Sequence, residues 1–245
     1  MNCLISASVS AELAPAGKLR VGINYGNPVL AAKDPATGEL RGVAVDLAQE
    51  LARRIGLPID LVAFESAGKM VEGLRGGAWD IAFLAVDPER AANLSFTAPY
   101  IEIEGTYLVP AGSPIHSIAE VDREGVRVGV SANSAYDLFL SRSLQHAQRV
   151  PAGDPNAAFE LIVAGKVDVV AGVKQHLLAN SEKLAGSRVL DGRFMAIQQA
   201  LGIPKARQAG AAYLREFIED VKASGFVAQA IAKAGILGVS VAPKA

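Results

Sequence analysis

The sequence has few of the residues that build disulfide frameworks or metal centres. Its single cysteine, Cys3, excludes an intrachain disulfide and any multi-cysteine metal site. The three histidines (His116, His146 and His176) are not spaced as a metal-binding pair. We therefore expect neither a metal ion nor another cofactor.

Long apolar runs and a strong charge of one sign are also missing. No apolar run approaches the roughly 18 residues of a membrane-spanning helix. The formal net charge of −1 argues against a nucleic-acid partner. Apolar residues make up 51% of the 245 residues, which is enough for one large α/β domain or for two lobes.

The N-terminus gives conflicting signals. Val9-Ser10-Ala11 resembles a signal-peptidase site, but no positively charged region precedes it. The apolar stretch before it is short and interrupted by serines, and Cys3 lacks the apolar motif that precedes a lipoprotein cysteine. We interpret residues 1–16 as a tail or signal remnant without structural importance.

The segment from Gly76 to Val109 is the most informative. After a Gly-Gly turn, residues 79–86 are almost all apolar, which is typical of a strand covered on both faces. Asp87-Pro88 then predicts a helix start, with proline at the first helical position. The turn therefore places polar groups at the carboxyl end of a parallel strand, where ligands bind in open α/β sheets.

The same segment resembles the bacterial extracellular solute-binding proteins of family 3, the amino-acid receptors of ABC importers. The resemblance rests on Asp80 at the strand start, Pro88-Glu89-Arg90 in the turn, Phe96-Thr97-Ala98-Pro99-Tyr100 and the strand 105–109. It continues through most of the chain. It implies a periplasmic monomer that binds a small-molecule solute and delivers it to a membrane ABC permease.

The chain also contains two copies of one strand–helix plan. Predicted strands alternate with predicted helices in the order 19–23, 43–55, 58–64, 68–74, 79–86, and again in the order 126–130, 135–144, 148–150, 156–164, 167–173. Such alternation predicts parallel sheets, and the motif Gly77-x-x-Asp80 of the first copy recurs as Gly165-x-x-Asp168 in the second. We expect an α/β, two-lobed, periplasmic-binding-protein-like fold, in which each lobe has its own mostly parallel sheet flanked by helices, with a cleft between the lobes.

The lobe boundary is predicted at the turn cluster 110–114. Because the resembled family crosses back after its second sheet, residues 193–204 are the expected return segment. This gives lobe 1 at 17–109 and 195–245 and lobe 2 at 110–194, joined by a two-segment hinge.

The first candidate ligand contacts, Asn24, Tyr25 and Asn27, follow the first strand. Family members that bind cationic amino acids usually present an acidic and an aromatic residue in this loop. Asn24 and Asn27 therefore weaken the case for a cationic ligand, although ordinary turn chemistry explains both asparagines equally well.

Asp87 and Arg90 form the second candidate cluster. The resemblance implies that Arg90 clamps a ligand carboxylate, because a planar guanidinium meets two oxygens at once. The stretch from Asp80 to Arg90 is about two residues shorter than the family pattern, and Asp87 replaces a threonine. The alternative is that Asp87 only caps the helix and Arg90 lies on its surface. We favour the carboxylate contact.

The third candidate cluster, Asn133-Ser134-Ala135-Tyr136, opens a helix after the strand 126–130. Ser134 offers a hydroxyl, and the free backbone N–H groups behind it form an anion site. The resemblance implies that this segment contacts the same carboxylate from lobe 2, while Ala135 departs from the usual hydroxyl pair. Helix capping by Ser134 is compatible with that role.

Val173 stands where amino-acid-binding members carry the carboxylate for the ligand's α-ammonium. A buried ammonium without such a partner would be strongly unfavourable. Either Asp87 or Glu65 takes this role, or the ligand has no α-amino group. Lys174 would favour a second anionic group if it faces the cleft, and is otherwise a solvated lysine in the first helical turn.

No catalytic triad order, phosphate loop or metal-ligand spacing indicates an enzyme. Some proteins of this fold are cyclohexadienyl dehydratases, but Val173 does not supply the cleft acid expected for that activity. A ligand-sensing module is a further alternative, which the end of the chain at Ala245 without a membrane span disfavours. We predict a non-enzymatic receptor for a small carboxylate, such as an amino-acid analogue or a dicarboxylate, with a polar amino acid as the close competitor.

Overall fold

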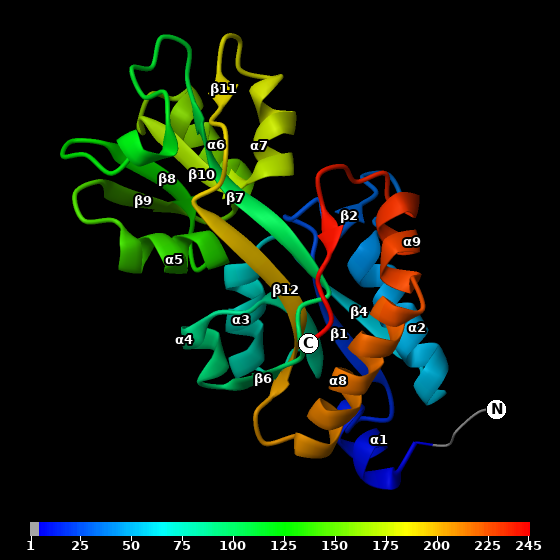
Figure 1. Cartoon of the computed structure of the whole chain (residues 1–245). Coiled ribbons are helices and arrows are strands. Elements are labelled where there is room, and N and C mark those ends of the chain that lie inside the picture. The colour runs from blue at the N-terminus through cyan, green and yellow to red at the C-terminus, as the bar shows by residue number, and fades with distance from the viewer. Residues whose placement is uncertain (1–4) are drawn as a thin grey trace.

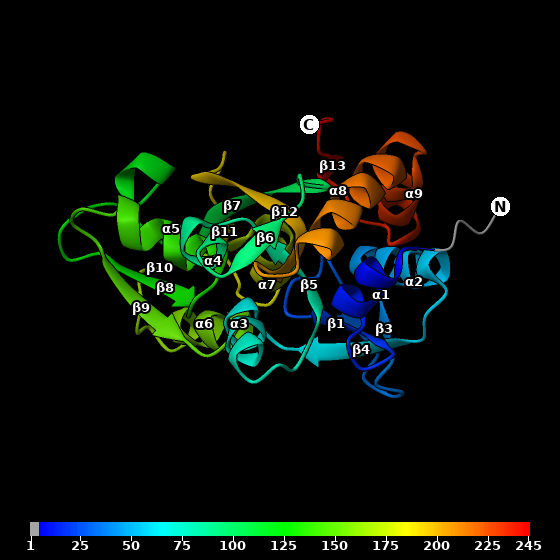
Figure 2. The same cartoon turned by 90° about the horizontal axis from the view of Figure 1, so that it is seen from below.

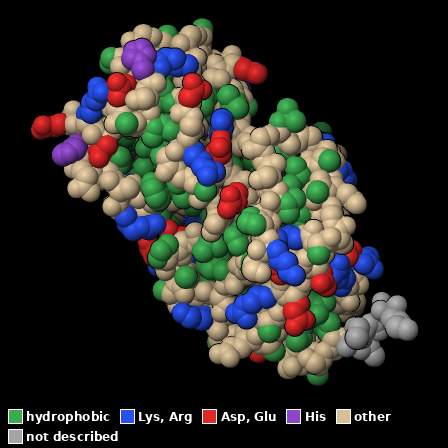
Figure 3. Space-filling model, viewed as in Figure 1, with side chains coloured by type: hydrophobic (Ala, Val, Ile, Leu, Met, Phe, Trp, Pro, Cys, Tyr) green, Lys and Arg blue, Asp and Glu red, His purple; other side chains and the backbone are tan. Residues whose placement is uncertain are grey.

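The computed structural model describes residues 5–245, so Cys3 lies outside the described residues. Two lobes lie side by side, with strands running through both and helices covering their outer faces (Figures 1 and 2). Within the described residues, no helix is long and apolar enough to cross a membrane. Acidic and basic side chains are interspersed over the face seen in Figure 3.

The first lobe contains most of the N-terminal elements. They are α1 (Ala7–Leu13), β1 (Leu19–Asn24), β2 (Ala32–Lys33), β3 (Leu40–Arg41), α2 (Val43–Ile55), β4 (Ile59–Phe64), α3 (Ala67–Arg75), β5 (Ile81–Ala85), α4 (Pro88–Ala91) and β6 (Leu94–Phe96). The C-terminal elements α8 (Gln208–Ala223), α9 (Phe226–Lys233) and β13 (Ser240–Val241) return to this lobe (Figure 1).

The second lobe repeats the strand–helix plan. Its elements are the 3₁₀ helix η1 (Ile118–Glu120), β8 (Arg127–Ser131), α5 (Ala135–Ser143), β9 (Gln148–Ala152), α6 (Pro155–Val163), β10 (Val169–Val173), α7 (Lys174–Ser181) and β11 (Arg188–Val189). The long strands β7 (Ile101–Val109) and β12 (Met195–Pro204) pass between the lobes (Figure 1).

The strands follow the order β4-β1-β5-β12-β7-β10-β8-β9. β1 is parallel to β4 and β5, and β8 is parallel to β9 and β10. The predicted two-lobed α/β fold is therefore confirmed. The expectation of a separate sheet in each lobe is wrong, because the antiparallel pairing of β7 with β12, from Gly105–Met195 to Ile101–Gln199, joins the two sheets into one.

The partners of β7 change along its length. Its first half pairs with β12, whereas residues 105–108 pair with β10 of the second lobe. The turn at 110–114 follows the end of β7 in the second lobe. The division into 17–109 with 195–245 and 110–194 stays a prediction.

The sequence repeat predicted around Asp80 and Asp168 corresponds to the same contact in both lobes. Arg20 Nε donates to Asp80 Oδ2 at 2.9 Å, and Arg127 Nε donates to Asp168 Oδ2 at 3.0 Å. Each carboxylate also accepts a second guanidinium N–H and the backbone N–H of its arginine. The first contact links β1 to the start of β5, and the second links β8 to the start of β10. The bidentate geometry of each contact fixes the register of its two strands.

Residues 7–13 correct the interpretation of 1–16 as a tail without structural importance. They form α1, which packs against α8, and Leu13 is fully buried. The Glu12 carboxylate accepts the backbone N–H of Gly210 at 2.7 Å, and its carbonyl accepts from Arg207 at 3.0 Å. The packing partners of α1 lie about 200 residues away in sequence, so local patterning did not reveal them.

Asp80→Ala should destabilise the protein more than the matched change Asp168→Ala. The Asp80 side chain is fully buried and also contacts Arg207, whereas Asp168 is 39% exposed. We expect a loss of about 3 kcal/mol in the free energy of unfolding for Asp80→Ala and about 1 kcal/mol or less for Asp168→Ala. Urea denaturation at neutral pH measures both, and equal losses would contradict the difference in burial.

The same contact predicts a pH dependence. Burial alone would raise the pKa of Asp80, but hydrogen bonds from Arg20 and Arg207 outweigh it and hold that pKa below its ordinary value. A lowered carboxyl pKa stabilises the fold above the unfolded value of about 4, and this stabilisation is lost as the pH falls through the folded value. Asp80→Ala should therefore show a smaller loss of stability than wild type on acidification from neutral pH.

Candidate functional site

A cleft lies between the lobes. The first lobe contributes the loop after β1, the β5 strand and Arg90, while β12 contributes side chains from the crossing region. The second lobe contributes the β8–α5 junction, the start of α6 and the β10–α7 junction. The carboxyl ends of parallel strands thus meet at one site, as expected for ligand clefts in open α/β sheets.

Arg90 lines this cleft although its turn is shorter than the resembled pattern. It is 4% exposed, and its terminal nitrogens donate to the Ala85 carbonyl at 3.0 Å and to the Asn133 carbonyl at 2.9 Å. Its Nε is buried and has no hydrogen-bond partner in the described residues. Burial lowers the pKa of Arg90 to about 10 against the opposing effect of the Asp87 and Glu89 carboxylates, so the guanidinium stays cationic at neutral pH. Two of its five N–H groups donate to these carbonyls, which leaves three without a hydrogen bond to a described residue.

The second lobe presents the start of α5 to the cleft. Ser134 caps this helix by accepting the Asp137 N–H at 3.1 Å, and Ser134, Ala135 and Tyr136 line the cleft. Burial raises the pKa of the Tyr136 phenol to about 12, while the hydroxyls of the neighbouring serines oppose this shift. Asn133 has φ 57° and contributes its carbonyl to Arg90, but its side chain does not line the cleft.

The loop after β1 contributes two of its three predicted contacts. Asn24 and Asn27 line the cleft, and their side-chain oxygens accept the N–H groups of Gly26 at 3.0 Å and Val29 at 3.1 Å. These hydrogen bonds leave the NH₂ group of each asparagine unused. Tyr25 lies outside the cleft, with the Lys33 ammonium 5.3 Å from its ring centroid.

The predicted charged contacts other than Arg90 have partners elsewhere. Asp87 caps α4 and accepts from Arg142 at 2.7 Å, and Glu65 forms an ion pair with Lys69. None of the side chains in these two ion pairs, Asp87–Arg142 and Glu65–Lys69, lines the cleft. Asp87 therefore acts as both the predicted helix cap and a contact to α5 of the other lobe.

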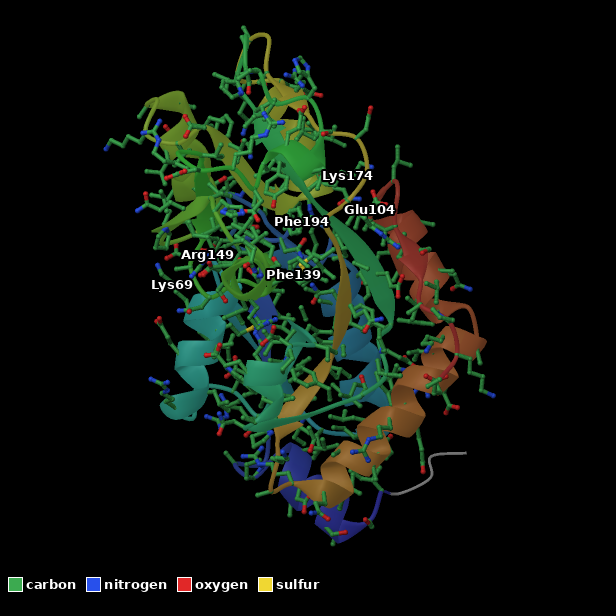
Figure 4. The ribbon with its side chains drawn as sticks, turned by 60° about the vertical axis from the view of Figure 1, so that its left-hand side comes forward. Lys69, Glu104, Phe139, Arg149, Lys174 and Phe194 are labelled. Atoms are coloured by element: carbon green, nitrogen blue, oxygen red, sulfur yellow. The ribbon has the colours of Figure 1, made fainter. Side chains whose placement is uncertain are left out.

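The β10–α7 junction carries no carboxylate into the cleft. Val173 lines it and is 8% exposed. Lys174 points away from it and donates to Glu104 of β7 at 2.7 Å, and both side chains lie beside the crossing strands in Figure 4. Among the described residues that line the cleft, no side chain carries a negative charge at neutral pH.

Sequence patterns missed several lining residues, and three of them are polar: Ser131, His176 and Gln199. His176 of α7 and Gln199 of β12 both face the cleft. Gln199 could have been found from the alternation along β12, where Ile197 and Gln199 fall on one face and the exposed Gln198 on the other.

Several contacts hold the lobes together around the cleft. Besides the Arg90–Asn133 and Arg142–Asp87 contacts, Gln175 of α7 donates to the Leu237 carbonyl at 3.1 Å. The lobes are also packed closely where α3 meets the loop before α5. A Cβ atom at Gly68 would lie 2.5 Å from the Ala132 carbonyl oxygen.

The sequence profile of the bacterial extracellular solute-binding proteins, family 3, matches residues 19–235. The chain belongs to this family, and it is a solute-binding receptor. A curated relative, the glutamine-binding protein of Geobacillus stearothermophilus, is 25% identical over 194 residues, which cover 77% of this chain and 73% of the relative.

Solved structures of solute-binding proteins share the fold. A mutant of ArgBP from T. maritima superposes with a TM-score of 0.79 at 21% identity, covering 93% of this chain and 99% of that one. The ancestral amino acid-binding protein AncCDT-1, a precursor of cyclohexadienyl dehydratase, gives a TM-score of 0.77 at 22% identity, with coverage of 93% and 99%. At these identities the likeness concerns the fold alone.

Gly68→Ala should block the contact between the lobes without harming the first lobe. The added methyl group would overlap the Ala132 carbonyl only when the lobes meet, at a cost of about 1–3 kcal/mol. Solute affinity should fall accordingly, while the stability without solute should rise slightly because alanine favours the helix. Calorimetric titration with a bound solute measures the loss.

Gly76→Ala is the matched control. Its added methyl group would meet nothing closer than 3.8 Å, and its φ of −86° suits any residue. Its affinity should equal that of wild type. Unchanged affinity in Gly68→Ala would show that solute binding does not require this arrangement of the lobes.

Proposed function

We propose that this receptor captures a small carboxylate or amino-acid-like solute in the interlobe cleft and delivers it to a membrane ABC permease. We also propose that it acts in the periplasm as a monomer and catalyses no reaction. The main support for this proposal is Arg90, a buried cation with three unused N–H groups at the junction of the lobes. An anionic solute is the group that satisfies it.

Closure provides the proposed signal of occupancy. Arg90 belongs to the first lobe and the start of α5 to the second, and both line the cleft. A carboxylate between them would contact guanidinium N–H groups on one side and the Ser134 helix start on the other. Because only a solute that touches both lobes favours the closed state, binding and closure are coupled. We propose β7 and β12 as the hinge of this motion, with lobes at 17–109 plus 195–245 and at 110–194.

The ion pairs formed by Lys174 and Asp87 limit which solutes the cleft can bind. Lys174 is paired with Glu104 and Asp87 with Arg142, so neither is free to bind a second carboxylate or an ammonium. This favours a single carboxylate over a dicarboxylate that also uses Lys174. The names of the relatives still point to amino acids, so amino acids belong in any screen.

Arg90→Ala should abolish solute binding. We would screen amino acids and organic acids by thermal shift, since a ligand at about 100 times its dissociation constant adds roughly 2.7 kcal/mol of stability. Every stabilising solute should lose its effect in Arg90→Ala, because the carboxylate loses its buried cation. Arg41→Ala, at an exposed arginine outside the cleft, should behave like wild type. A full shift retained by Arg90→Ala would overturn the proposed carboxylate site.

The dehydratase alternative gains its support from the fold shared with AncCDT-1. No described residue that lines the cleft carries a carboxylate, which speaks against chemistry that calls for an acid or base beside the substrate. Incubation with prephenate or arogenate should give no phenyl product by absorbance. Sustained turnover that His176→Ala abolishes would instead establish an enzyme.

A further inference from the structure

The side chain of Gln199 has an unusual position in the cleft. Gln199 lies on β12, where its backbone pairs with Ala85 of β5 and Ile101 of β7. It therefore occupies the centre of the joined sheet, where the fold fixes its position. The alternation of the strand directs Ile197 and Gln199 into the cleft.

The Gln199 carboxamide is buried without a partner for its oxygen. The residue is 4% exposed, and Oε1 has no hydrogen-bond partner among the described residues. A desolvated amide oxygen is costly unless a donor reaches it. The neighbouring Gln198 differs, since it is exposed and donates to Glu102 at 3.3 Å. The unsatisfied acceptor thus belongs to the cleft and not to the strand in general.

The electrostatics of the cleft limit what kind of donor this can be. His176 brings no charge, because burial lowers its pKa and its Nε2 lies 2.8 Å from the Asn180 amide nitrogen. Lys183 donates to the Asn180 oxygen at 3.0 Å, which fixes that amide as the donor to His176. Among the described lining residues, Arg90 is then the only one that carries a full charge at neutral pH.

A cleft with one fixed positive charge is balanced by a solute with one net negative charge. A zwitterionic amino acid brings no net charge, and its ammonium would be desolvated without a carboxylate partner. A carboxylate that also carries a neutral O–H or N–H group satisfies both Arg90 and Gln199. Among the described lining residues, every polar group other than Arg90 is neutral, so that second group would meet no further charge.

We propose that Gln199 is a specificity residue that accepts a hydrogen bond from a neutral donor on a monoanionic carboxylate solute. The inference rests on the proposed function, because it requires Arg90 to hold the carboxylate. The solute class is a 2-hydroxy acid or another monocarboxylate with a neutral donor near the carboxylate. Gln199 does not touch the carboxylate itself, so its removal changes selectivity and leaves carboxylate binding in place.

Matched solute series test the proposal. Titration calorimetry would compare 2-hydroxy acids, 2-amino acids and unsubstituted acids of the same skeletons: lactate, alanine and propionate; 2-hydroxyisovalerate, valine and isovalerate; mandelate, phenylglycine and phenylacetate. Wild type should bind the hydroxy acid of the best skeleton roughly tenfold more tightly than the unsubstituted acid, as expected of one buried hydrogen bond. The corresponding amino acid should bind more weakly than the hydroxy acid.

Two substitutions separate the roles of shape and charge. Gln199→Leu should remove the preference for the hydroxy acid while keeping the affinity for the unsubstituted acid. Gln199→Glu should raise the ratio of amino-acid to hydroxy-acid affinity by at least about tenfold, because it supplies a carboxylate for the ammonium. Gln198→Leu and Gln198→Glu, at the exposed neighbour, should leave both ratios at their wild-type values.

The unfolding temperature without solute shows whether Gln199 has a purely structural role. Gln199→Leu should unfold at the wild-type temperature or above, since it removes an unsatisfied buried amide. Preference for the hydroxy acid retained in Gln199→Leu would overturn the proposal, as would tighter binding of amino acids by wild type. Either result would leave the receptor function intact, provided that Arg90→Ala still abolishes binding. If no member of any series binds wild type, the proposed monocarboxylate class is wrong.

Discussion

The buried guanidinium of Arg90 is the interaction on which the site depends. It extends from the short helix α4 of the first lobe to the Asn133 carbonyl of the second. The Asp87 and Glu89 carboxylates favour its charged form, but no described residue that lines the cleft carries a carboxylate. Because a buried charge is costly unless it is paired and hydrogen-bonded, an anion in the cleft would stabilise the closed arrangement. The same residue therefore links charge recognition to the relative position of the lobes.

The framework around Arg90 was largely predictable because its signals are local. The apolar stripe of α2 at four-residue spacing and its glycine end predicted a helix that the structure bounds at Val43 and Ile55. Asp87-Pro88 predicted the start of α4, and Asp87 does cap it. The repeated Gly-x-x-Asp motif predicted equivalent units, which the structure joins by equivalent arginine contacts. Each of these features is specified within a few residues of sequence.

The features that the sequence did not predict depend on partners that are distant in sequence. Asp87 is occupied by Arg142, 55 positions away, and Lys174 by Glu104, 70 positions away. Sequence patterns suggested helix capping by Asp87 and solvent exposure of Lys174 as alternatives, but they did not indicate either ion pair. The continuity of the sheet and the packing of α1 on α8 are hidden for the same reason. Gln199 is the reverse case, because its buried oxygen has no hydrogen-bond partner among the described residues.

Satisfied and unsatisfied polar groups together define what the cleft can recognise. The asparagines after β1 have their oxygens engaged by their own loop, and both ring nitrogens of His176 have neighbours in its lobe. These side chains are fixed before any solute arrives, which lowers the entropy lost on binding. Among the described residues that line the cleft, Arg90, Ser131 and Gln199 have buried polar atoms without a hydrogen-bond partner, and of these three only Arg90 is charged. Recognition by one cation and neutral polar groups, held by rigid surroundings, favours an anion over a zwitterion.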